Sequence, residues 1–468
     1  MSNIVTIEHI KTVYFVGIKG VGMTALAAIV HEMGKTVLGS DNGDSFGTDS
    51  VLHEKHISVY EGFDPEHVVE LAKKYPGELL VITTGAHGGM KNPEVVKALS
   101  LSIPVLSHGE ALGLIMKSKR GISVSGTHGK STTSAMIAHI LSMTGKDPAY
   151  AIGVSGIATL GYPGHWGEGE WFVAEADEYV TDPGTDKTPR FHHQHPEVGI
   201  ITSIDYDHPD VFASLDEVKR AFMQFAKQVE KLLVFNKDDV NVRSIVSRIQ
   251  PATSYSYGQD AEADIRLVSY NAQYQKAHVS VRVGMTQRQF MLSVPGRHNA
   301  LNACAAVGVC SYAGLSWSEI ASGLETFRGT KRRFEFVAEH NNVLYYDDYA
   351  HHPAEIRATL AAAKEWFSGH RIKVIFQPHT YSRTKALLDE FATSFVDADM
   401  VFITPIFASA RETPDASVTG KSLAAAVSRH HPSVLYVESP DNVVPAIKKN
   451  DILMTMGAGD VYKWHEKL

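Results

Sequence analysis

Cysteine is scarce in this chain: two residues of this type, Cys304 and Cys310, occur among 468 positions. They lie six positions apart in a run typical of a helix. That spacing turns the two side chains toward different faces, which disfavours a disulfide between them. So little cysteine fits a reducing compartment. We therefore expect the protein to work in the cytoplasm.

Long apolar runs and an excess of basic residues are absent as well. No apolar stretch approaches the ~18 residues that a bilayer span requires, and Glu8, His9 and Lys11 stand where a signal peptide would continue. The formal net charge is −8 at pH 7, which disfavours nucleic-acid binding. We expect no membrane span and no nucleic-acid partner, and a chain that is a monomer or a weak homodimer.

The sequence also lacks low-complexity tracts and obvious internal repeats. Its content of 44% hydrophobic and 21% charged residues is ordinary for a globular protein. A length of 468 residues suggests about three domains. Because strand-like and helix-like runs alternate throughout, the sequence predicts α/β domains, which we place at residues 1–115, 116–328 and 329–468.

The stretch on which the rest of the chain depends is a glycine-rich turn. It lies between the apolar residues 121–124 and a helical run at 134–141, and it contains Gly126, Thr127, His128, Gly129, Lys130, Ser131 and Thr132. Such a turn cradles a nucleotide phosphate, because the glycines let backbone N–H groups approach the anion and the helix adds its positive N-terminus. Lys130 is expected to reach the outer phosphates and Ser131 a magnesium ion.

The match to the usual phosphate-binding motif is partial. The full motif has a glycine where this chain has Val124. An ordinary strand-to-helix turn with a surface lysine is therefore the alternative interpretation of this stretch.

A second glycine turn follows a predicted strand at residues 13–16 and precedes a helical run at 25–33. Its order is G-x-x-G-x-G, from Gly17 to Gly22, and not the G-x-G-x-x-G of dinucleotide enzymes. A nicotinamide-dependent dehydrogenase is thus a weakly supported alternative, and a nucleotide diphosphate at Gly20 and Gly22 also fits. Asp41 ends the next strand, where a ribose hydroxyl would be read, although it could equally cap a turn.

Acidic clusters follow two strand-like runs of the central segment. Glu175, Asp177 and Glu178 come after residues 171–174, and a cluster with Asp207 and His208 comes after 198–202. Neighbouring carboxylates repel one another, which costs free energy unless a cation lies nearby. The two clusters therefore indicate a magnesium nucleotide site. A solvated acidic turn is the alternative for either cluster alone.

Two further polar groups of the central segment are interpreted differently. The histidine-rich run 191–196 lacks the spacing and the cysteines of a zinc site, so we expect surface or substrate-facing histidines there. Asn299 and Asn302 fall on one face of a helix that starts near Gly296. An amide can pair with a purine edge, but Asn299 could also cap that helix.

Polar residues also follow apolar strands in the last segment. Asp347, Asp348, Tyr349, His351 and His352 come after a predicted strand at 343–346, residues 377–383 after 374–376, and residues 457–460 after 452–456. Open α/β sheets bind ligands at the carboxyl ends of their strands. This segment therefore predicts a ligand-binding edge in a third α/β domain.

Taken in order, these motifs resemble the Mur ligases of peptidoglycan synthesis. The likeness covers essentially the whole chain. It rests on the turn at Gly17, G-T-H-G-K-S at 126–131, E-A-D-E at 175–178, D-H at 207–208, H-N at 298–299 with Asn302, R-R-F at 332–334, D-D-Y-A-H-H-P at 347–353, F-Q-P-H at 376–379 with Arg383, and G-A-G-D at 457–460.

The resemblance implies an architecture and a reaction. The family has a Rossmann-like domain for the UDP substrate, a central ATPase domain, and a Rossmann-like C-terminal domain that brings the amino acid. ATP, with Mg²⁺, phosphorylates the substrate carboxylate, and an amine attacks the acyl phosphate. The chain is most similar to members that join L-alanine to UDP-N-acetylmuramate, a step of cell-wall synthesis on which cell shape and division depend. The alternative is the recycling ligase that adds L-alanyl-γ-D-glutamyl-meso-diaminopimelate.

The resemblance also implies roles for individual residues. Lys130 holds the phosphates, Ser131 and Glu175 hold magnesium, and His208 serves a metal near the acyl phosphate. Asn299 faces adenine, Arg333 and Asp348 link the C-terminal domain to ATP, and His351, His379 and Arg383 orient the amino acid.

Three features depart from the family pattern. Ser131 replaces the common threonine, which is harmless. Thr380 stands where some relatives have arginine, so carboxylate capture depends more on Arg383. Residues 179–195 form a longer segment than expected.

Overall fold

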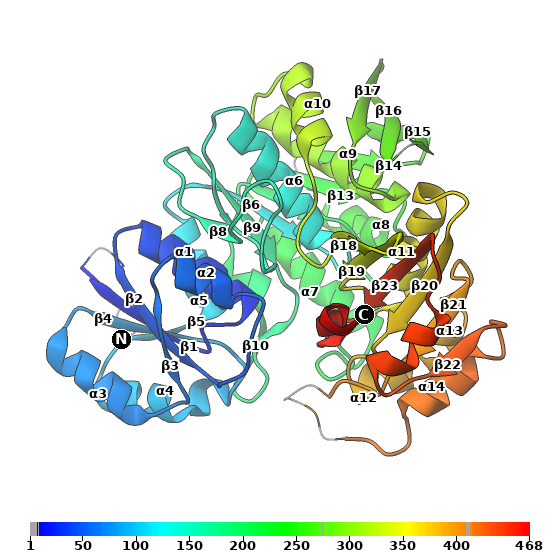
Figure 1. The fold of residues 1–468 in the computed structure, drawn as a ribbon. Helices are drawn as coiled ribbons and strands as arrows, with labels where there is room; N and C mark the ends of the chain where they lie inside the picture. Colours follow the sequence, from blue (N-terminus) through cyan, green and yellow to red (C-terminus); the bar gives the residue numbers. More distant parts are fainter. Residues whose placement is uncertain (1–6, 8, 252, 274, 409–411, 413) are drawn as a thin grey trace.

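The structure is a computed structural model that describes residues 7, 9–251, 253–273, 275–408, 412 and 414–468. Three α/β units follow one another along the chain (Figure 1). We call them the N-terminal unit (β1 to α5), the central unit (β6 to α10) and the C-terminal unit (β18 to η5). The expected three-domain α/β architecture is confirmed.

The N-terminal unit is built on a parallel sheet. Among the described residues this sheet has five strands in the order β3-β2-β1-β4-β5. Strands β1 and β4 of this sheet are buried at every residue, as expected for a parallel sheet that is covered on both faces. The elements are β1 Thr12–Val16, α1 Val21–Glu32, β2 Thr36–Asp41, α2 Asp49–Glu54, β3 Ser58–Glu61, α3 Pro65–Lys74, β4 Leu79–Thr83, η1 Gly89–Lys91, α4 Pro93–Ser100, β5 Val105–Ser107 and α5 His108–Met116.

Two details of this unit differ from the sequence prediction. Helix α1 begins at Val21, directly after the glycine turn and not at residue 25. No helix was expected at residues 108–116, but they form helix α5, because Ser107 and Glu110 make a reciprocal capping box at its start.

The central unit contains the largest sheet. In the part of the chain that the structure describes, ten strands lie in the order β17-β16-β15-β14-β13-β12-β6-β9-β7-β8. The strands from β9 to β15 are parallel, and β15, β16 and β17 form an antiparallel meander. The phosphate loop lies between the central strand β6 and helix α6.

The bounds of the central elements are β6 Arg120–Ser125, α6 Lys130–Met143, β7 Ala149–Ala151, β8 Gly164–His165, β9 Trp171–Ala176, β10 Val180–Asp182, β11 Asp186–Pro189, η2 Arg190–His193, β12 Val198–Ile201, α7 Leu215–Lys227, β13 Leu232–Asn236, α8 Val240–Ile249, β14 Ser254–Gly258, β15 Ile265–Gln273, β16 Lys276–Val283, β17 Thr286–Leu292, α9 Arg297–Tyr312 and α10 Trp317–Thr326.

The C-terminal unit has a mixed sheet. Six described strands lie in the order β18-β19-β23-β20-β21-β22, and β18 is the antiparallel one at the edge. The elements are β18 Glu335–His340, β19 Val343–Asp348, α11 Pro353–Trp366, β20 Arg371–Phe376, α12 Tyr381–Ala386, α13 Leu388–Ala392, β21 Met400–Ile403, α14 Gly420–Val427, β22 Val434–Tyr436, η3 Pro440–Asn442, η4 Val444–Ala446, β23 Asp451–Met456 and η5 Val461–Lys467.

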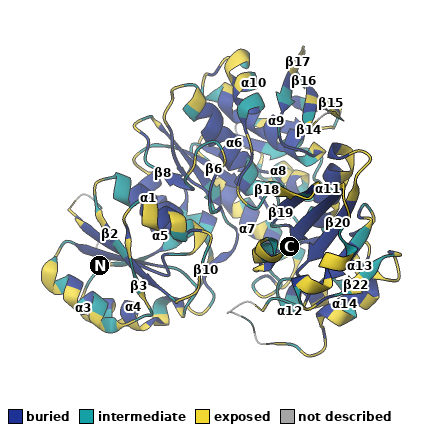
Figure 2. Cartoon of the chain, in the orientation of Figure 1, coloured by how far each residue is buried: buried dark blue, intermediate teal, exposed yellow. Residues whose placement is uncertain are grey.

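Buried apolar side chains do not stop at the border between the central and C-terminal units. One cluster of buried residues runs from strands β6 and β12, through helix α9, to helix α11 and strands β20 and β23. The sheets are correspondingly dark in the burial view (Figure 2). The N-terminal unit has separate clusters, one of which includes Ala149 and Phe172 of the central sheet.

The segment 179–195 packs against the N-terminal unit. It forms the antiparallel hairpin β10–β11 and then the short helix η2. Asp182 Oδ2 accepts a hydrogen bond of 2.9 Å from the Met90 N–H, and a Cβ added at Gly85 would lie 2.5 Å from the Thr181 carbonyl oxygen. A Cβ at Gly89 would meet the Asp182 carboxylate. The segment therefore braces the N-terminal unit against the central unit.

Two remaining sequence predictions concern cysteine and the membrane. Cys304 and Cys310 are both buried and free in helix α9. Of the helices that the structure describes, none is long and apolar enough to cross a membrane.

Candidate active site

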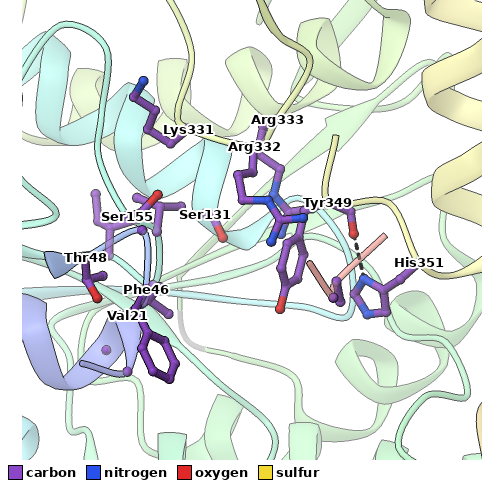
Figure 3. Close-up of a pocket in the computed structure, with 18 of the residues that line it drawn as sticks. Val21, Phe46, Thr48, Ser131, Ser155, Lys331, Arg332, Arg333, Tyr349 and His351 are labelled. Atoms are coloured by element: carbon purple, nitrogen blue, oxygen red, sulfur yellow. Dashed lines mark hydrogen bonds between the residues drawn. The ribbon is translucent and has the colours of Figure 1, made fainter. Parts of the chain in front are cut away.

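The three units enclose a cavity of about 1530 Å³. Side chains from the N-terminal, central and C-terminal units line it together (Figure 3). Of the residues predicted from the sequence, the cavity brings together Gly20, Gly22, Thr127, Lys130, Ser131, Glu175, His208, Arg333, His351, His379 and Arg383. Asp41, Gly126, His128, Gly129, Thr132, Asn299 and Asp348 do not line it.

The phosphate loop, residues 126–132, has a backbone that requires glycine at two positions. Gly126 and Gly129 have φ angles of 139° and 81°, which other residues adopt at a cost. A Cβ at Gly129 would lie 2.7 Å from Asn302 Oδ1, and one at Gly126 would meet the Thr202 hydroxyl. The two glycines thus let the loop pack against Thr202 and Asn302 at the start of helix α6, whose N-terminus fits a phosphate group.

Lys130 folds back onto this loop. Its ammonium group donates to the carbonyl oxygens of Gly126 at 2.6 Å and Thr127 at 3.2 Å, and to Glu178 Oε2 at 2.9 Å. Burial lowers the pKa of Lys130, but Glu178, Asp177 and Glu175 outweigh burial and raise it above its ordinary value. Lys130 is therefore a fixed positive charge beside the cradle.

The carboxylates near Lys130 occupy different environments. Burial raises the pKa of Glu178, which lies beside a second carboxylate, Asp177. Burial also raises the pKa of Asp177, but the positive charges of Arg190 and Lys130 outweigh burial and lower this pKa to about 2. Arg190 donates to the Asp177 carboxylate at 2.9 Å. Glu175 ends strand β9, and its Oε2 accepts from the Gly153 N–H at 2.9 Å.

The cavity beside the phosphate loop is lined by a hydroxyl group and by carboxylate oxygens. Ser131, in the first turn of α6, and Glu175, at the end of β9, both line the cavity. Oxygen donors of this kind suit Mg²⁺, which accompanies nucleotide phosphates. His208 lines the same cavity, and its ring meets Tyr179 edge-on with centroids 4.9 Å apart.

A second group of metal-ligand types lies outside the cavity. His128, Asp205 and His352 bring one ligand atom each to within 4.8 Å of one another. However, the Ala354 N–H donates to His352 Nδ1 at 3.3 Å, so a neutral His352 ring carries its proton on Nε2. A metal ligand needs a lone pair on that atom. We therefore interpret His128 and Asp205 as a hydrogen-bonded pair, with the His352 ring packed beside His128 at a centroid distance of 4.9 Å.

Two of the histidines of the C-terminal unit that line the cavity, His351 and His379, are neutral at neutral pH. Burial and the Arg383 charge lower the pKa of His351 to about 4, and burial and His351 lower that of His379 to about 3. His351 Nδ1 lies 2.8 Å from the Tyr349 carbonyl oxygen and donates to it (Figure 3). The Nε2 atom of His351 is therefore an acceptor.

Arg383 is held by a residue of the central unit. Its Nε and Nη2 donate to Asp207 Oδ1 at 2.9 and 2.8 Å, and both side chains are buried. Its Nη1 lies 3.4 Å from His379 Nδ1. Two of its donors are therefore already engaged, which was not foreseen for a residue expected to capture a ligand carboxylate.

The neighbouring arginines of the basic run differ in their contacts. Arg332 donates to Asp347 at 2.9 Å and to the Gly457 carbonyl at 2.7 Å, and it lies over the rings of Tyr349 and Tyr462. Arg333 also lies over the Tyr349 ring, with its guanidinium 5.1 Å from the ring centroid. Both arginines line the cavity, although the sequence singled out Arg333 alone.

Asp41 lies away from the cavity because the glycine turn uses its carboxylate. It is 1% exposed, and its two oxygens accept from the backbone N–H groups of Lys19 and Asn42, both at 2.8 Å. The turn-capping alternative accounts for these contacts, and no contact with a ribose is needed to explain this residue.

Asn299 and Asp348 also organise backbone. Asn299 donates to the Pro295 carbonyl at 2.7 Å and accepts from Asn302, while the helix α9 begins without a side-chain cap. Asp348 accepts from the N–H groups of Phe334 and Ala350, both at 2.8 Å. Burial raises its pKa to about 6, against the effect of Arg333.

Sequence reasoning missed the pairing roles of three acidic residues in or beside the motifs. Asp207, Glu178 and Glu355 each hold a predicted residue through a hydrogen bond. Asp207 and Glu178 stand inside motifs that were recognised, and Glu355 follows the two histidines by three positions. The signal that could have indicated these roles was the presence of a charged residue in or next to each motif.

Three models of one family match the chain in succession. The model described as "Mur ligase family, catalytic domain" matches residues 12–120, "Mur ligase middle domain" matches 124–310, and "Mur ligase, glutamate ligase domain" matches 332–459.

Curated relatives extend this likeness over the full chain. A UDP-N-acetylmuramate--L-alanine ligase from Desulfitobacterium hafniense is 37% identical over 464 residues, covering 97% of this chain and 99% of the relative. A protein of the same name from Geobacter sp. is 36% identical over 471 residues, covering 98% and 97%.

Solved structures agree. The UDP-N-acetylmuramate-alanine ligase of Thermotoga maritima superposes with a TM-score of 0.79 at 27% identity, covering 97% of both chains. A murein peptide ligase of Psychrobacter arcticus superposes with a TM-score of 0.70 at 23% identity, covering 98% of both, and thus shares the fold.

Proposed function

Because this chain belongs to the Mur ligase family, we propose that it ligates L-alanine to the carboxylate of UDP-N-acetylmuramate at the expense of ATP. One observation carries the proposal beyond family membership. A single cavity joins the phosphate loop, the glycine turn of the N-terminal unit and the histidines of the C-terminal unit. A reaction of three ligands needs such a meeting point, whereas a dehydrogenase or a simple NTPase does not.

The chemistry explains why a phosphate loop serves a ligase. A carboxylate is a poor electrophile, so the γ-phosphoryl group of ATP is transferred to it, which gives an acyl phosphate and ADP. The amine of L-alanine then attacks the acyl carbon, the amide bond forms, and phosphate leaves with the C–O bond electrons. The protein contributes positioning and charge neutralisation.

Lys130 and the cradle of residues 126–132 hold the phosphate groups of ATP in this proposal. Ser131 and Glu175, with His208, would hold magnesium, which neutralises phosphate charge when bound. The permanent positive charge of Lys130 stabilises the negative charge that spreads over the transferred group. Glu178 keeps the ammonium group in place until the nucleotide arrives.

Gly20 and Gly22 would receive the diphosphate of the UDP substrate. They lie at the start of helix α1 and line the cavity, on the side of the N-terminal unit. The positive end of that helix favours an anion. Arg333, across the cavity in the C-terminal unit, would link ATP to that unit.

His351, His379 and Arg383 would form the amine site. The acceptor atom of His351 suits an N–H of the incoming amine, and the N–H donors of Arg383 that Asp207 does not engage suit its carboxylate. A pocket closed by these three residues favours a small amino acid over the tripeptide of the recycling ligase. Because size discrimination is worth only ~1–3 kcal/mol per methylene, glycine and L-serine should react measurably but less well.

A competition assay tests the assignment. Purified protein receives ATP, Mg²⁺, UDP-N-acetylmuramate, and equal concentrations of L-alanine and L-alanyl-γ-D-glutamyl-meso-diaminopimelate. We expect the L-alanine adduct to dominate and phosphate release to require both co-substrates. A product dominated by the tripeptide adduct, or ATP hydrolysis indifferent to UDP-N-acetylmuramate, would contradict the proposal.

We also propose that the enzyme works in the cytoplasm as a monomer or weak homodimer, with domain limits near residues 115 and 328. Sedimentation at micromolar concentration tests the oligomeric state, and limited proteolysis followed by mass spectrometry tests the limits.

A further inference from the structure

His128 connects the phosphate loop to the C-terminal unit. Its backbone is held by the central unit: its N–H donates to Ser203 Oγ at 2.9 Å and its carbonyl accepts from Thr202 Oγ1 at 2.5 Å. Its ring, in contrast, turns away from the cavity. Nδ1 lies 3.1 Å from Glu355 Oε1 on helix α11, and Nε2 lies 3.5 Å from Asp205 Oδ2.

The contact with Glu355 is charge-assisted. Burial lowers the pKa of His128, but the hydrogen bonds with Asp205 and Glu355 prevail and raise it to about 9. The pKa of Glu355 lies well below its ordinary value, since His351 and His128 outweigh its burial. At neutral pH the pair is thus a cation and an anion in contact across two units, and such hydrogen bonds are the stronger kind.

Glu355 uses its other oxygen on the amine site. Oε2 accepts from the backbone N–H of His351 at 3.1 Å and of His352 at 3.3 Å, and it lies 3.5 Å from His351 Nδ1. The same carboxylate therefore holds the phosphate-loop histidine with one oxygen and the amine-site histidine with the other. Within the described part of the chain, the polar contacts that we find between the phosphate loop and the C-terminal unit run through His128.

We propose that Glu355 is a positioning residue that couples occupancy of the phosphate loop to the placement of His351. Phosphates bound in the cradle fix the loop and therefore the position of His128. Glu355, which contacts His128 with one oxygen, then holds the backbone N–H of His351 with the other. The amine site is then best formed when the nucleotide is bound. The inference rests on the proposed function in so far as it takes ATP and L-alanine as the two ligands.

Coupling of this kind is reciprocal, which makes it measurable without turnover. If ATP prepares the amine site, L-alanine must strengthen ATP binding by the same factor. Calorimetry with a non-hydrolysable ATP analogue, in the presence of UDP-N-acetylmuramate and with or without L-alanine, gives this factor. We expect it to be on the order of ten in the unaltered protein.

Three variants separate coupling from a purely structural role. Glu355→Gln keeps the size and an acceptor for the capping box of α11 but loses the charge. His128→Ala removes the other partner. Glu365→Gln, at an exposed position of the same helix, is the matched control. Thermal unfolding of each variant is measured first.

In Glu355→Gln and in His128→Ala the coupling factor should fall toward one, and the double variant should lose no more than either single variant. KM for L-alanine should rise roughly tenfold, more than kcat falls, while Glu365→Gln behaves as the unaltered protein. A coupling factor unchanged in Glu355→Gln, or effects of the single variants that multiply in the double variant, would overturn the proposal.

Hydrogen exchange of residues 349–357 provides a readout that does not depend on the amine. The ATP analogue alone should slow exchange in this segment, and Glu355→Gln should abolish the slowing. If L-alanine proves not to be the substrate, this result still stands, so the two proposals fail separately. Equal slowing in Glu355→Gln and Glu365→Gln would count against the coupling. This comparison needs only these two variants, so it holds even if His128→Ala or the double variant does not fold.

Discussion

Lys130 holds its ammonium group against the carbonyl oxygens of the phosphate loop and against Glu178. Replacing it by alanine removes the main side-chain cation from the phosphoryl group, which we expect to cost on the order of several kcal/mol in the transition state and to abolish measurable turnover. Phosphate release at saturating Mg²⁺ measures the effect, with Lys227→Ala at an exposed position as the control.

The same substitution leaves Glu178 buried without its partner, which lowers stability as well. Thermal unfolding therefore accompanies the assay. Near-normal turnover by a folded Lys130→Ala protein would show that the phosphate loop has been misassigned.

His139 allows a pH prediction outside the active site. It is 2% exposed in helix α6, and burial lowers its pKa to about 4, despite the Gly323 backbone contact. The unfolded chain binds a proton near pH 6.5 and the folded protein does not, so stability falls as the pH drops from about 6.5 to 4.

Replacing His139 by glutamine should reduce the loss of unfolding free energy between pH 7 and pH 4 by on the order of 1–3 kcal/mol. Urea unfolding at several pH values measures it. Several other buried histidines shift in the same direction, so the unaltered protein should be acid-sensitive overall. An identical pH slope in the variant would contradict the role of His139.

At the scale of elements, the hairpin β10–β11 makes the segment 179–195 a brace for the N-terminal unit. Asp182→Ala removes an acceptor for the Met90 N–H, a charged hydrogen bond worth ~1.5–3 kcal/mol. We expect KM for UDP-N-acetylmuramate to rise several-fold with little change for ATP, because the loosened unit carries the UDP site. Steady-state kinetics with each substrate varied in turn measure this.

Asp186→Ala is the matched control on the same hairpin, because Asp186 contacts the Thr188 backbone within the hairpin itself. If both variants raised KM for ATP and for UDP-N-acetylmuramate equally, the hairpin would act through general stability and not as a brace.

Regular elements with apolar strands and glycine turns were predictable from the sequence. Strands β1 and β23 were placed within one residue of their observed bounds, and the helical run predicted at 134–141 lies inside helix α6. The meander β15–β17 and the hairpin β10–β11 were not anticipated. In β16 the buried residues Ala277, Val279 and Val281 alternate with polar ones, a strand signal that was overlooked. Strands β10 and β11 have three and four residues, too few to show such a period.

The candidate site was predictable in its motifs but not in its internal pairing. Residues that follow strand ends, such as His351 and His379, line the cavity as expected. The engagement of Arg383 by Asp207 joins positions 176 apart in sequence, and no local pattern encodes such a contact. Asp41 and Asn299 were predicted to contact a ligand, but their side chains form hydrogen bonds with nearby backbone groups. Any short polar side chain can form such bonds, so the sequence does not distinguish the two roles.

At the scale of the whole molecule, Asp207 and Arg383 fasten the C-terminal unit to the central one. Asp207→Asn should raise KM for L-alanine about tenfold or more, because a buried charged hydrogen bond is worth at least ~1.5 kcal/mol and Arg383 loses its fixed orientation. Asp216→Asn, exposed on α7, is the control. An effect confined to KM for ATP would argue against a role at the amine site.

The apolar core that continues from helix α9 into helix α11 has a calorimetric consequence. Elements that share one core lose their packing together, so the central and C-terminal units should melt as a single cooperative block. Among the described residues, the N-terminal unit shares with the central sheet only the cluster that includes Ala149 and Phe172 and has a second cluster to itself, so it can melt in a separate step. Scanning calorimetry should then resolve two heat-absorption peaks from a chain of three α/β units, and the nucleotide should shift the larger peak.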